Sequence, residues 1–401
     1  MLSVSEALGY ILDDAASLAE EELSLADIVG RVAVEPLRAR MTQPPFAASA
    51  MDGYAVRFAD AGKEATLNLI GEAPAGVPFS GMVGAGEAVR IFTGGVVPDG
   101  ADHIVVQEDV TRQGDQIVIE QEQPTPRHIR KAGIDFAEGD MLVEAGTVLN
   151  EMHGSILAAA NIGTVNVVRR PKVALFSNGN ELRGPGDQLH PGEIINSNHY
   201  ALTAMVRRWG GEPVYLGCAR DDEKEIERFF VKATGVEIGA DVIVPIGGAS
   251  VGDFDFVKSA FDRAGGALTF SKIAVRPGKP TWFGRLDPAR VIGLPGNPAS
   301  ALVTAALFLQ PLVRALGGQG AQEIGFQQGV LGRDLPANGA RESFLRGSAT
   351  ATGNDKMIVT PVVNQDSSLL SPFLTADVLI RRQNEAPATA AGEAIEFVRL
   401  R

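Results

Sequence analysis

Apolar residues recur at helical spacing near the start of the chain. They occupy the i, i+3, i+4 positions of one helix face: Val4, Ala7, Leu8, Ile11 and Leu12. Ser3 and Glu6 form a capping-box pattern before them, so a helix is predicted over residues 3–19. A second helix is predicted over roughly 23–40, and the QPPF segment from Gln43 ends it because proline stops helices.

The region from residue 65 to 145 has the pattern of β-structure. Short strand-like runs such as Val89–Phe92 and His103–Val106 are separated by glycine and proline. Residues 109–119 read as a hairpin. The pattern is typical of a small barrel or sandwich, and helix returns at residues 150–161.

From residue 171 onward, apolar runs of strand length alternate with helical patterns. The predicted strands are Lys172–Phe176, Pro213–Leu216, Asp241–Pro245 and Val291–Leu294. The predicted helices are 198–209, 222–234, 255–264 and 298–316. This alternation predicts a parallel sheet with helices on both faces.

After about residue 325 the chain turns β-rich again and remains so to its last residue. We therefore predict an α/β fold combined with β-rich domains. The expected divisions are an N-terminal region over 1–170 with an inserted β-rich domain at about 50–145, an α/β domain over 171–320, and a small C-terminal β-barrel-like domain over 321–401.

Composition excludes several classes of protein. The formal net charge is −13, which argues against a nucleic-acid or anionic-membrane partner. The apolar stretches, such as Ala299–Leu309, are of core-helix length, and the acidic start of the chain lacks the features of a secretory signal, so we expect a soluble cytoplasmic protein. The single cysteine, Cys218, is expected to be a small buried hydrophobe.

Polar or glycine-rich segments follow the predicted strands of the α/β domain. They begin at Ser177, Arg220, Gly247 and Leu294, and they include Glu181, Asp221, Pro295 and Asn297. Ligands of open parallel sheets bind beyond the carboxyl ends of the strands, so these segments are predicted to form one site. Ordinary turns would supply part of the same pattern.

The loop GGASVGDFD, residues 247–255, favours an anion or phosphate. Gly247, Gly248 and Gly252 let backbone amides approach a ligand closely, Ser250 adds a hydroxyl, and the loop opens onto a helix. Asp255 would oppose an anion unless a cation bridges them; with Glu181 and Asp221 it offers the oxygen ligands that Mg²⁺ prefers. Helix capping by Asp253 or Asp255 is an equally good explanation of these carboxylates.

Basic residues lie between this loop and the LPGNP segment. Lys272, Arg276 and Lys279 occur in SKIAVRPGKP, which looks extended. The proline-glycine turn would present Arg276 and Lys279 to one edge, although basic turn residues are often only solvated surface.

A second group of candidate residues lies in the N-terminal half. Asp52 belongs to SAMDGYA, Thr93 follows a strand in FTGG, and Arg130 and Asp135 belong to RHIRKAGID. Hydroxyl, amide and guanidinium donors of this kind suit a tetrahedral oxyanion such as molybdate. Each of these short motifs is weak by itself.

Taken together, the motifs resemble the molybdopterin molybdenumtransferase family, the MoeA type also seen as the E domain of gephyrin. The segments that match in order are PPF with SAMDGYAV, RIFTGG with PDGAD, IRKAGID, VALFSNGNEL, EIINSN, RDD, GGASVGDFD, RPGKP and LPGNPASA. They extend over nearly the whole chain.

The resemblance implies properties that the residues alone do not establish. It implies an elongated, multidomain homodimer with a central molybdopterin-binding-like α/β domain, and an active site in a cleft formed with the partner subunit. The expected reaction converts adenylyl-molybdopterin and molybdate to molybdenum-molybdopterin and AMP, assisted by Mg²⁺. The expected partners are the molybdopterin adenylyltransferase and acceptor molybdoenzymes, with no nucleic acid and no membrane.

By motif position the resemblance also implies a set of functional residues. The catalytic set is Asp52, Thr93, Arg130, Asp135, Glu181, Asp221, Asp255, Lys272, Arg276 and Lys279. The substrate-binding set is Gly247, Gly248, Ser250, Gly252, Pro295, Asn297, Pro298 and Ser371. The metal ligands are Glu181, Asp221 and Asp255.

The chain departs from the family pattern at several positions. Asn178 and Asn180 stand where threonine and aspartate are usual, and Pro245 and Ile246 stand where hydroxyl residues are usual. These changes remove a carboxylate and several donors. Two alternative functions stay open: a molybdopterin-binding paralogue without transfer activity, and a molybdopterin adenylyltransferase.

Overall fold

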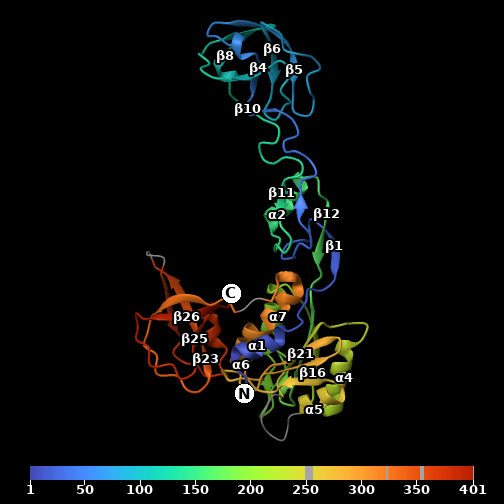
Figure 1. The fold of residues 1–401 in the computed structure, drawn as a ribbon, viewed down its shortest axis with the longest axis vertical. Helices are drawn as coiled ribbons and strands as arrows, with labels where there is room; N and C mark the ends of the chain where they lie inside the picture. The colour runs from blue at the N-terminus through green and yellow to red at the C-terminus, as the bar shows by residue number, and fades with distance from the viewer. Residues whose placement is uncertain (249–255, 322–323, 353–355, 401) are drawn as a thin grey trace. The chain divides into compact units, whose positions relative to one another are not determined.

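The computed structural model describes residues 1–248, 256–321, 324–352 and 356–400 (Figure 1). The chain forms two compact units. Unit 1 comprises Met1–Glu21, Gly30–Val34 and Asn166–Arg401, and unit 2 comprises Glu22–Val29 and Glu35–Val165.

A six-stranded sheet forms the centre of unit 1. Its strand order is β16-β13-β17-β21-β20-β18. The strands are β13 (Lys172–Asn178), β16 (Glu212–Ala219), β17 (Val242–Ile246), β18 (Ala267–Phe270), β20 (Trp282–Leu286) and β21 (Ala289–Gly293). The first four in spatial order are parallel, as predicted, whereas β20 and β18 were not foreseen and add an antiparallel edge. A small parallel pair, β14 (Leu182–Arg183) with β15 (Ile194–Ile195), lies outside this sheet.

Both faces of the sheet are buried under helices. Along β13, Val173 and Leu175 join one apolar cluster, and Ala174 and Phe176 join another. The covering helices are α1 (Val4–Leu12), α3 (Asn198–Arg208), α4 (Glu223–Thr234), α5 (Phe256–Arg263), α6 (Pro298–Thr304) and α7 (Gln310–Arg314). Burial on two faces explains why the strands read as continuous apolar runs.

The helical run Pro298–Gln319 is longer than the sequence predicted. It contains α6, α7 and the π-helical turns η3 (Ala305–Leu309) and η4 (Ala315–Gln319). It contains an 18-residue window of mean hydropathy 1.6, which by length and composition alone would suit a membrane span. However, 83% of this 18-residue window is buried inside the protein, as expected of a helix in the core.

The C-terminal part of unit 1 is a closed β-structure. The sheet order is β19-β23-β24-β22-β26-β25, and a further pairing of β23 with β25 closes it into a barrel. The strands are β19 (Val275–Arg276), β22 (Gln327–Leu331), β23 (Glu342–Ala351), β24 (Met357–Pro361), β25 (Val378–Arg382) and β26 (Ala394–Arg399), with the 3-10 turn η5 at Ser371–Leu374. Phe344 and Leu379 of this barrel belong to the same core as α1 and the long helical run.

Unit 2 is built on a six-stranded sheet in the order β7-β4-β6-β5-β9-β8. The strands are β4 (Gly53–Val56), β5 (Thr66–Ala73), β6 (Glu87–Ile91), β7 (His103–Val106), β8 (Val110–Gln113) and β9 (Gln116–Ile119), with 3-10 turns η1 (Phe58–Asp60) and η2 (Gln107–Asp109). The predicted hairpin is confirmed by the antiparallel pairing of β8 with β9.

Smaller elements complete unit 2. They are β2 (Leu37–Arg38) paired with β11 (Met141–Val143), β3 (Ala48–Ser49) paired with β10 (Ile129–Arg130), and α2 (Glu151–Ala159). A further two-stranded sheet pairs β1 (Glu20–Ser24) with β12 (Thr164–Val168).

Two sequence predictions for the N-terminal residues were wrong. The first helix keeps its predicted capping box but ends at Leu12, not at residue 19. The predicted helix over 23–40 is absent: β1 and β2 lie there, because tertiary pairing with β12 and β11 overrides local helical propensity. Helix α1 packs in the core of unit 1.

Candidate active site

The carboxyl ends of the parallel strands meet at one edge of the central sheet. Strand β13 ends at Asn178 beside Ala219 of β16, and Ile246 at the end of β17 pairs with Leu294 just after β21. The segments that follow these strands are those that the sequence predicted to converge.

A pocket of about 540 Å³ lies at this edge. Six of the predicted site residues line it: Glu181, Gly247, Gly248, Pro295, Asn297 and Pro298. Residues absent from the predicted set also line it, among them Asn178, Asn196, Asn198 and Ser368. Asn196 and Asn198 belong to the EIINSN segment, which matches the family, so the resemblance could have indicated them. Their spacing by itself did not point to a site.

Asp221 lies against the loop that follows β13. Its carboxylate accepts a hydrogen bond from the backbone N–H of Asn180 at 3.1 Å and from the side chain of Asn178 at 3.4 Å. The backbone N–H of Asp221 donates in turn to the Asn180 side chain at 3.3 Å. The two asparagines that depart from the family pattern therefore orient the carboxylate of Asp221.

Gly248 is required where the glycine-rich loop begins. Its φ is +63°, and a Cβ atom there would lie 2.3 Å from Cγ2 of Val257 and 2.7 Å from the side-chain nitrogen of Asn178. A larger residue would be strained in conformation and would also displace Asn178.

Two buried side-chain oxygens in the pocket wall receive no hydrogen bond from the described residues. They are Oδ1 of Asn178 and Oδ1 of Asn198. The Asn198 side chain is held in place because its nitrogen donates to the carbonyl of Gly296 at 2.7 Å. A buried acceptor without a donor is costly, so both oxygens favour a ligand that supplies a proton donor or a cation.

Behind the pocket lies a network of buried polar side chains. The Asn196 side chain donates to the hydroxyl of Tyr215 at 2.9 Å, and the hydroxyl of Ser177 donates to Oδ1 of Asn196 at 3.1 Å. The ring of His199 stacks on Tyr215, with 3.9 Å between the centroids. Burial lowers the pKa of His199 and raises that of Tyr215, so both groups are neutral at physiological pH.

The donor set fits a hard cation. Glu181 and Asp221 offer carboxylate oxygens, and Asn178 offers its unpartnered amide oxygen. Mg²⁺ takes oxygen ligands and usually keeps waters or substrate phosphates among them. Within the described residues, no three histidine, cysteine or acidic side chains come close enough to form a metal site by themselves. The third predicted ligand, Asp255, lies outside the described residues, as do Ser250 and Gly252.

A second pocket, of about 820 Å³, adjoins the first and is rich in positive charge. Its lining includes the predicted Arg276 and Lys279 together with Arg333, Arg341 and Arg382. Pro280 lines both pockets, and the Asn297 side chain donates to the hydroxyl of Ser367 across 3.3 Å. The oxygen-rich pocket and the cationic pocket are therefore contiguous.

Arg346 holds in place the segment 366–369, which contributes to the lining of both pockets. It is 1% exposed, and its guanidinium donates to the carbonyls of Asp366 and Leu369, both at 2.9 Å. Sequence reasoning missed Arg333, Arg341 and Arg346, because single arginines at irregular spacing carry no signal of a shared site. Their relation to Arg276 exists only after the barrel has folded.

The structure also brings together two predicted residues of unit 2. The carboxylate of Asp52 accepts hydrogen bonds from both the backbone N–H and the hydroxyl of Thr93, each at 2.7 Å. These bonds hold the pKa of Asp52 below its ordinary value. Arg130 lies on β10, which pairs with β3. The backbone of Ser49 in β3 forms hydrogen bonds with Gly94 and Gly95. The segments SAMDGYA, FTGG and RHIRKAGID are therefore neighbours.

Other predicted residues lie apart from the pockets described above. Lys272 is exposed in the segment between β18 and β19, and Ser371 is exposed at the start of η5. Asp135 is exposed in a turn whose backbone bonds to Gln43. The expectation that Cys218 is buried was wrong: it is exposed at the end of β16, an edge strand.

Family models match the chain along most of its length. The MoeA N-terminal region (domain I and II) matches residues 2–161, a probable molybdopterin binding domain matches 177–315, and the MoeA C-terminal region (domain IV) matches 328–400.

Curated relatives and solved structures agree with these matches. The molybdopterin molybdenumtransferase of Haemophilus influenzae is 34% identical over 398 residues, covering 98% of each chain. That of a Nostoc species is 36% identical over 329 residues, covering 80% of this chain and 74% of its own. A crystal structure of the molybdopterin biosynthesis MoeA protein from Pyrococcus horikoshii has a TM-score of 0.82 and 32% identity, covering 100% of this chain and 99% of that one. The chain belongs to the MoeA family, whose curated relatives are named molybdopterin molybdenumtransferase.

Proposed function

We propose that this chain is a molybdopterin molybdenumtransferase, which inserts molybdate into adenylyl-molybdopterin and releases AMP. The observation that carries the proposal is the pair of contiguous pockets, one walled by oxygen acceptors and the other by guanidinium and ammonium groups. Such a pair suits a ligand with several phosphates, held by cations at one part and by a bridging metal ion at another.

The cationic pocket is proposed to bind the oxyanions. Arg276 ends β19, Lys279 follows in the turn before β20, and Arg341 lines the same pocket from the position just before β23. Guanidinium groups bind phosphate in a bidentate manner, and an ammonium group acts as a point charge. Fixed cations of this kind stabilise charge that develops as a phosphate leaves.

The oxygen-rich pocket is proposed to hold Mg²⁺. Glu181, Asp221 and Asp255 would supply carboxylate oxygens, with the amide oxygen of Asn178 beside Asp221. Bound there, the ion would supply Lewis-acid neutralisation of phosphate oxygens. The hydrogen bonds from Asn178 and Asn180 orient Asp221 before the ion arrives.

The group in unit 2 is proposed to serve the same reaction. Asp52 fixes the hydroxyl of Thr93 by accepting a hydrogen bond from it, so the lone pairs of the hydroxyl oxygen face away from Asp52. Arg130 and Asp135 are proposed as the charged members of the group. Lys272, Ser371, Ser250 and Gly252 keep the substrate-binding or catalytic roles that the family resemblance implies.

The surroundings of the enzyme are likewise proposed. We infer a cytoplasmic homodimer that receives its substrate from the molybdopterin adenylyltransferase and serves acceptor molybdoenzymes. Sedimentation at several protein concentrations tests the dimer, and a monomer throughout would reject it.

The decisive experiment supplies adenylyl-molybdopterin, Mg²⁺ and molybdate and measures AMP release. We expect release that depends on molybdate and falls about 10²-fold in Lys279→Ala and in Asp255→Ala. Lys232→Ala, which removes one charge in the last turn of α4, is the matched control and is expected to retain full activity. Unchanged turnover in both site variants would reject the site assignment.

Two further measurements separate the alternatives. Adenylylation of molybdopterin by the protein with MgATP would favour an adenylyltransferase. Tight binding of the pterin without AMP release on addition of molybdate would favour a paralogue that only binds it.

A further inference from the structure

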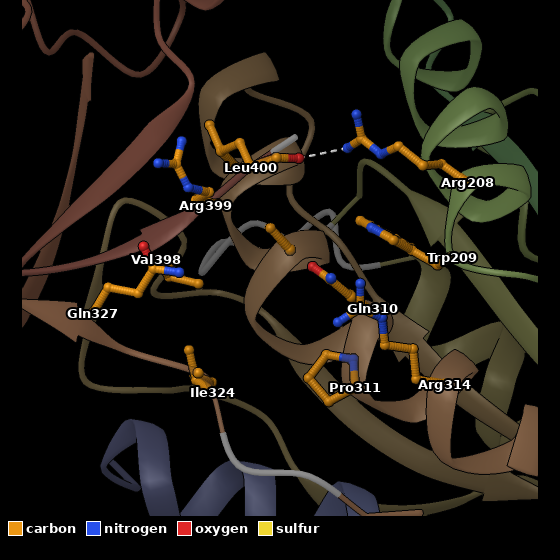
Figure 2. Close-up of a pocket in the computed structure, with 12 residues that line it drawn as sticks. Arg208, Trp209, Gln310, Pro311, Arg314, Ile324, Gln327, Val398, Arg399 and Leu400 are labelled. Carbon is orange, nitrogen blue, oxygen red and sulfur yellow. Dashed lines mark hydrogen bonds between the residues drawn. The ribbon is translucent and has the colours of Figure 1, made fainter. Parts of the chain in front are cut away.

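Several arginines outside the proposed active site are engaged by neighbouring groups. Figure 2 shows Arg208, Arg314 and Arg399 around a pocket of about 310 Å³ between α3, α7 and β26. Arg208 donates to the carbonyl of Leu400 at 2.6 Å, and the guanidinium of Arg399 lies 3.8 Å from the carboxylate of Asp377. These contacts hold the end of β26 in place, which is a structural role.

Arg90 of unit 2 differs from these arginines because it lies beside two residues of the predicted site. Strands β4 and β6 are antiparallel, with Tyr54 directly opposite Arg90. Asp52 precedes the first of these strands and Thr93 follows the second, so the pairing brings both residues to the same end of the sheet. Arg90 is the last but one residue of β6 before that end.

The guanidinium of Arg90 lies between two aromatic rings. Tyr54 is its cross-strand partner and Phe92 is two positions further along the chain, so all three side chains point to one face of the sheet. The central carbon of the guanidinium is 5.0 Å from the ring centroid of Tyr54 and 4.8 Å from that of Phe92. Both distances are within the roughly 6 Å over which the face of a ring attracts a cation. The two rings therefore fix the position of the charge of Arg90.

Two hydrogen bonds from the same guanidinium connect Arg90 to the backbone around Asp52. One terminal nitrogen donates to the carbonyl of Gly53 at 3.1 Å, and the other donates to the side-chain oxygen of Gln107 at 2.7 Å. Gly53 follows Asp52 in the chain, and the backbone N–H of Gln107 donates to the carbonyl of Asp52 at 3.1 Å. Neither hydrogen-bond partner of Arg90 is charged, so these bonds leave its positive charge uncancelled.

The carboxylate of Asp52 is influenced by this charge. The hydrogen bonds from the backbone and the hydroxyl of Thr93 are the main reason that the pKa of Asp52 is low, and the positive charge of Arg90 lowers it further. The ionised carboxylate is the form that accepts both bonds from Thr93. Arg90 therefore favours the same state of Asp52 through the backbone and through its charge.

We infer that Arg90 is a positioning residue for Asp52 and Thr93: it holds the backbone of Asp52 at the start of β4, and Asp52 in turn orients the hydroxyl of Thr93. The part of this inference that concerns AMP release rests on the proposed function. Because Arg90 acts through Asp52, its removal should have no further effect once Asp52 has lost its carboxylate.

A double-mutant cycle on AMP release tests the inference, with the full-length protein, adenylyl-molybdopterin, Mg²⁺ and molybdate. Arg90→Gln is expected to lower kcat about tenfold, the loss expected when hydrogen bonds from a charged group are removed. Adding Arg90→Gln to Asp52→Ala is expected to leave the rate of Asp52→Ala unchanged within about twofold. Arg112→Gln, which makes the same change at an exposed arginine of β8 in the same sheet, is the control and is expected to keep full activity.

Titration of Asp52 followed by carbon-13 NMR gives a second test that does not depend on the reaction. The signal of the labelled carboxyl is identified by its absence from the spectrum of Asp52→Asn. The pKa of Asp52 is expected to rise in Arg90→Gln, and to stay low in Arg112→Gln and in Arg90→Lys, which keeps the charge. A wild type that releases no AMP would reject the proposed function and leave this test intact.

Two results would overturn the inference. One is the same titration of Asp52 in the wild type and in a folded Arg90→Gln variant. The other is a pair of losses, from Arg90→Gln and from Asp52→Ala, that multiply in the double variant, because independent effects would mean that Arg90 does not act through Asp52. If Arg90→Gln does not fold, the cycle is carried out with Arg90→Lys, which lacks the forked pair of donors of arginine.

Discussion

The side-chain amide of Asn178 donates a hydrogen bond to the carboxylate of Asp221 across the ends of two adjacent parallel strands, at 3.4 Å. Asn180 adds a donor from its backbone and an acceptor from its side chain. Asp221 is thereby held in place by neutral donors and acceptors. Asn180 stands where the family usually has aspartate, and it holds Asp221 by hydrogen bonds without adding a charge.

This relationship predicts the effect of Asn180→Asp. Aspartate keeps the acceptor for the N–H of Asp221 and restores a carboxylate beside Glu181 and Asp221. One further charge near a dication contributes on the order of 1–2 kcal/mol in a solvated site, so the Mg²⁺ concentration for half-maximal AMP release should fall about tenfold. Asn180→Ala is the matched control, and an unchanged Mg²⁺ requirement in Asn180→Asp would show that no metal binds beside this residue.

Cys218 offers a measurement of the same region that does not depend on activity. Partial burial, and then the charges of Glu181, Asp221 and Glu225, raise the pKa of its thiol to about 11. Since only the thiolate reacts, alkylation by iodoacetamide at pH 8 should be roughly a hundredfold slower than that of an ordinary thiol, although the residue is exposed.

The sign of the metal effect on Cys218 follows from these charges. Mg²⁺ at Glu181 and Asp221 would cancel negative charge, lower the thiol pKa and accelerate alkylation, and Glu181→Gln should accelerate it without metal. Cys218 is the single cysteine of the chain, so mass spectrometry reads its modification directly. If saturating Mg²⁺ leaves the rate unaltered, the ion does not bind beside these carboxylates.

Asp52 and Thr93 predict a pH-dependent contribution to the stability of unit 2. The folded-state pKa of Asp52 is lowered, so its stabilisation is fully present above the ordinary aspartate value of about 3.9 and is lost as pH falls through the lower folded value. The difference in unfolding temperature between the wild type and Asp52→Ala should therefore be constant near neutrality and shrink in acid. A difference that grows in acid would contradict this assignment.

The role of Asp52 in the reaction can be separated from its structural role. Asp52→Asn keeps an oxygen that accepts from Thr93 but removes the charge. Full AMP release by Asp52→Asn together with loss in Asp52→Ala would assign Asp52 to positioning Thr93. Loss in both variants, with folding intact, would assign a role to the charge itself.

Asp241 is predicted to stabilise the start of the central sheet. Its two carboxylate oxygens accept from Arg169 at 2.6 and 2.8 Å, and one of them also accepts from the backbone N–H of Lys172 at 2.8 Å. Asp241→Ala should lower the free energy of unfolding by about 1.5–3 kcal/mol, the range for hydrogen bonds to charged groups. Glu227→Ala, which removes a more exposed ion pair with Arg263, is the comparison and should cost less than about 1 kcal/mol.

The alternation of apolar runs and helical periods determined the central domain from sequence alone. Lys172–Phe176 and Asp241–Pro245 were predicted as strands because a sheet buried on both faces requires apolar residues at every position. The same logic placed Glu181, Asn297 and the glycines at 247 and 248 beyond the strand ends, and they line one pocket. The strands can be predicted because their apolar runs are continuous in the sequence, and the position of the loops follows from the parallel direction of the strands.

Features that depend on distant partners were decided only by the tertiary structure. Residues 23–40 were predicted to be helical, yet β1 and β2 form there because the backbone donors and acceptors of β12 and β11 pair with them. Helix α1 joined the core of unit 1 because its apolar face packs against the helical run of residues 298–319, which lies about 300 positions later. Arg341 joins Arg276 and Lys279, and Arg314 joins Arg399, only when the barrel closes beside the α/β domain, because no local spacing encodes a contact between such distant residues.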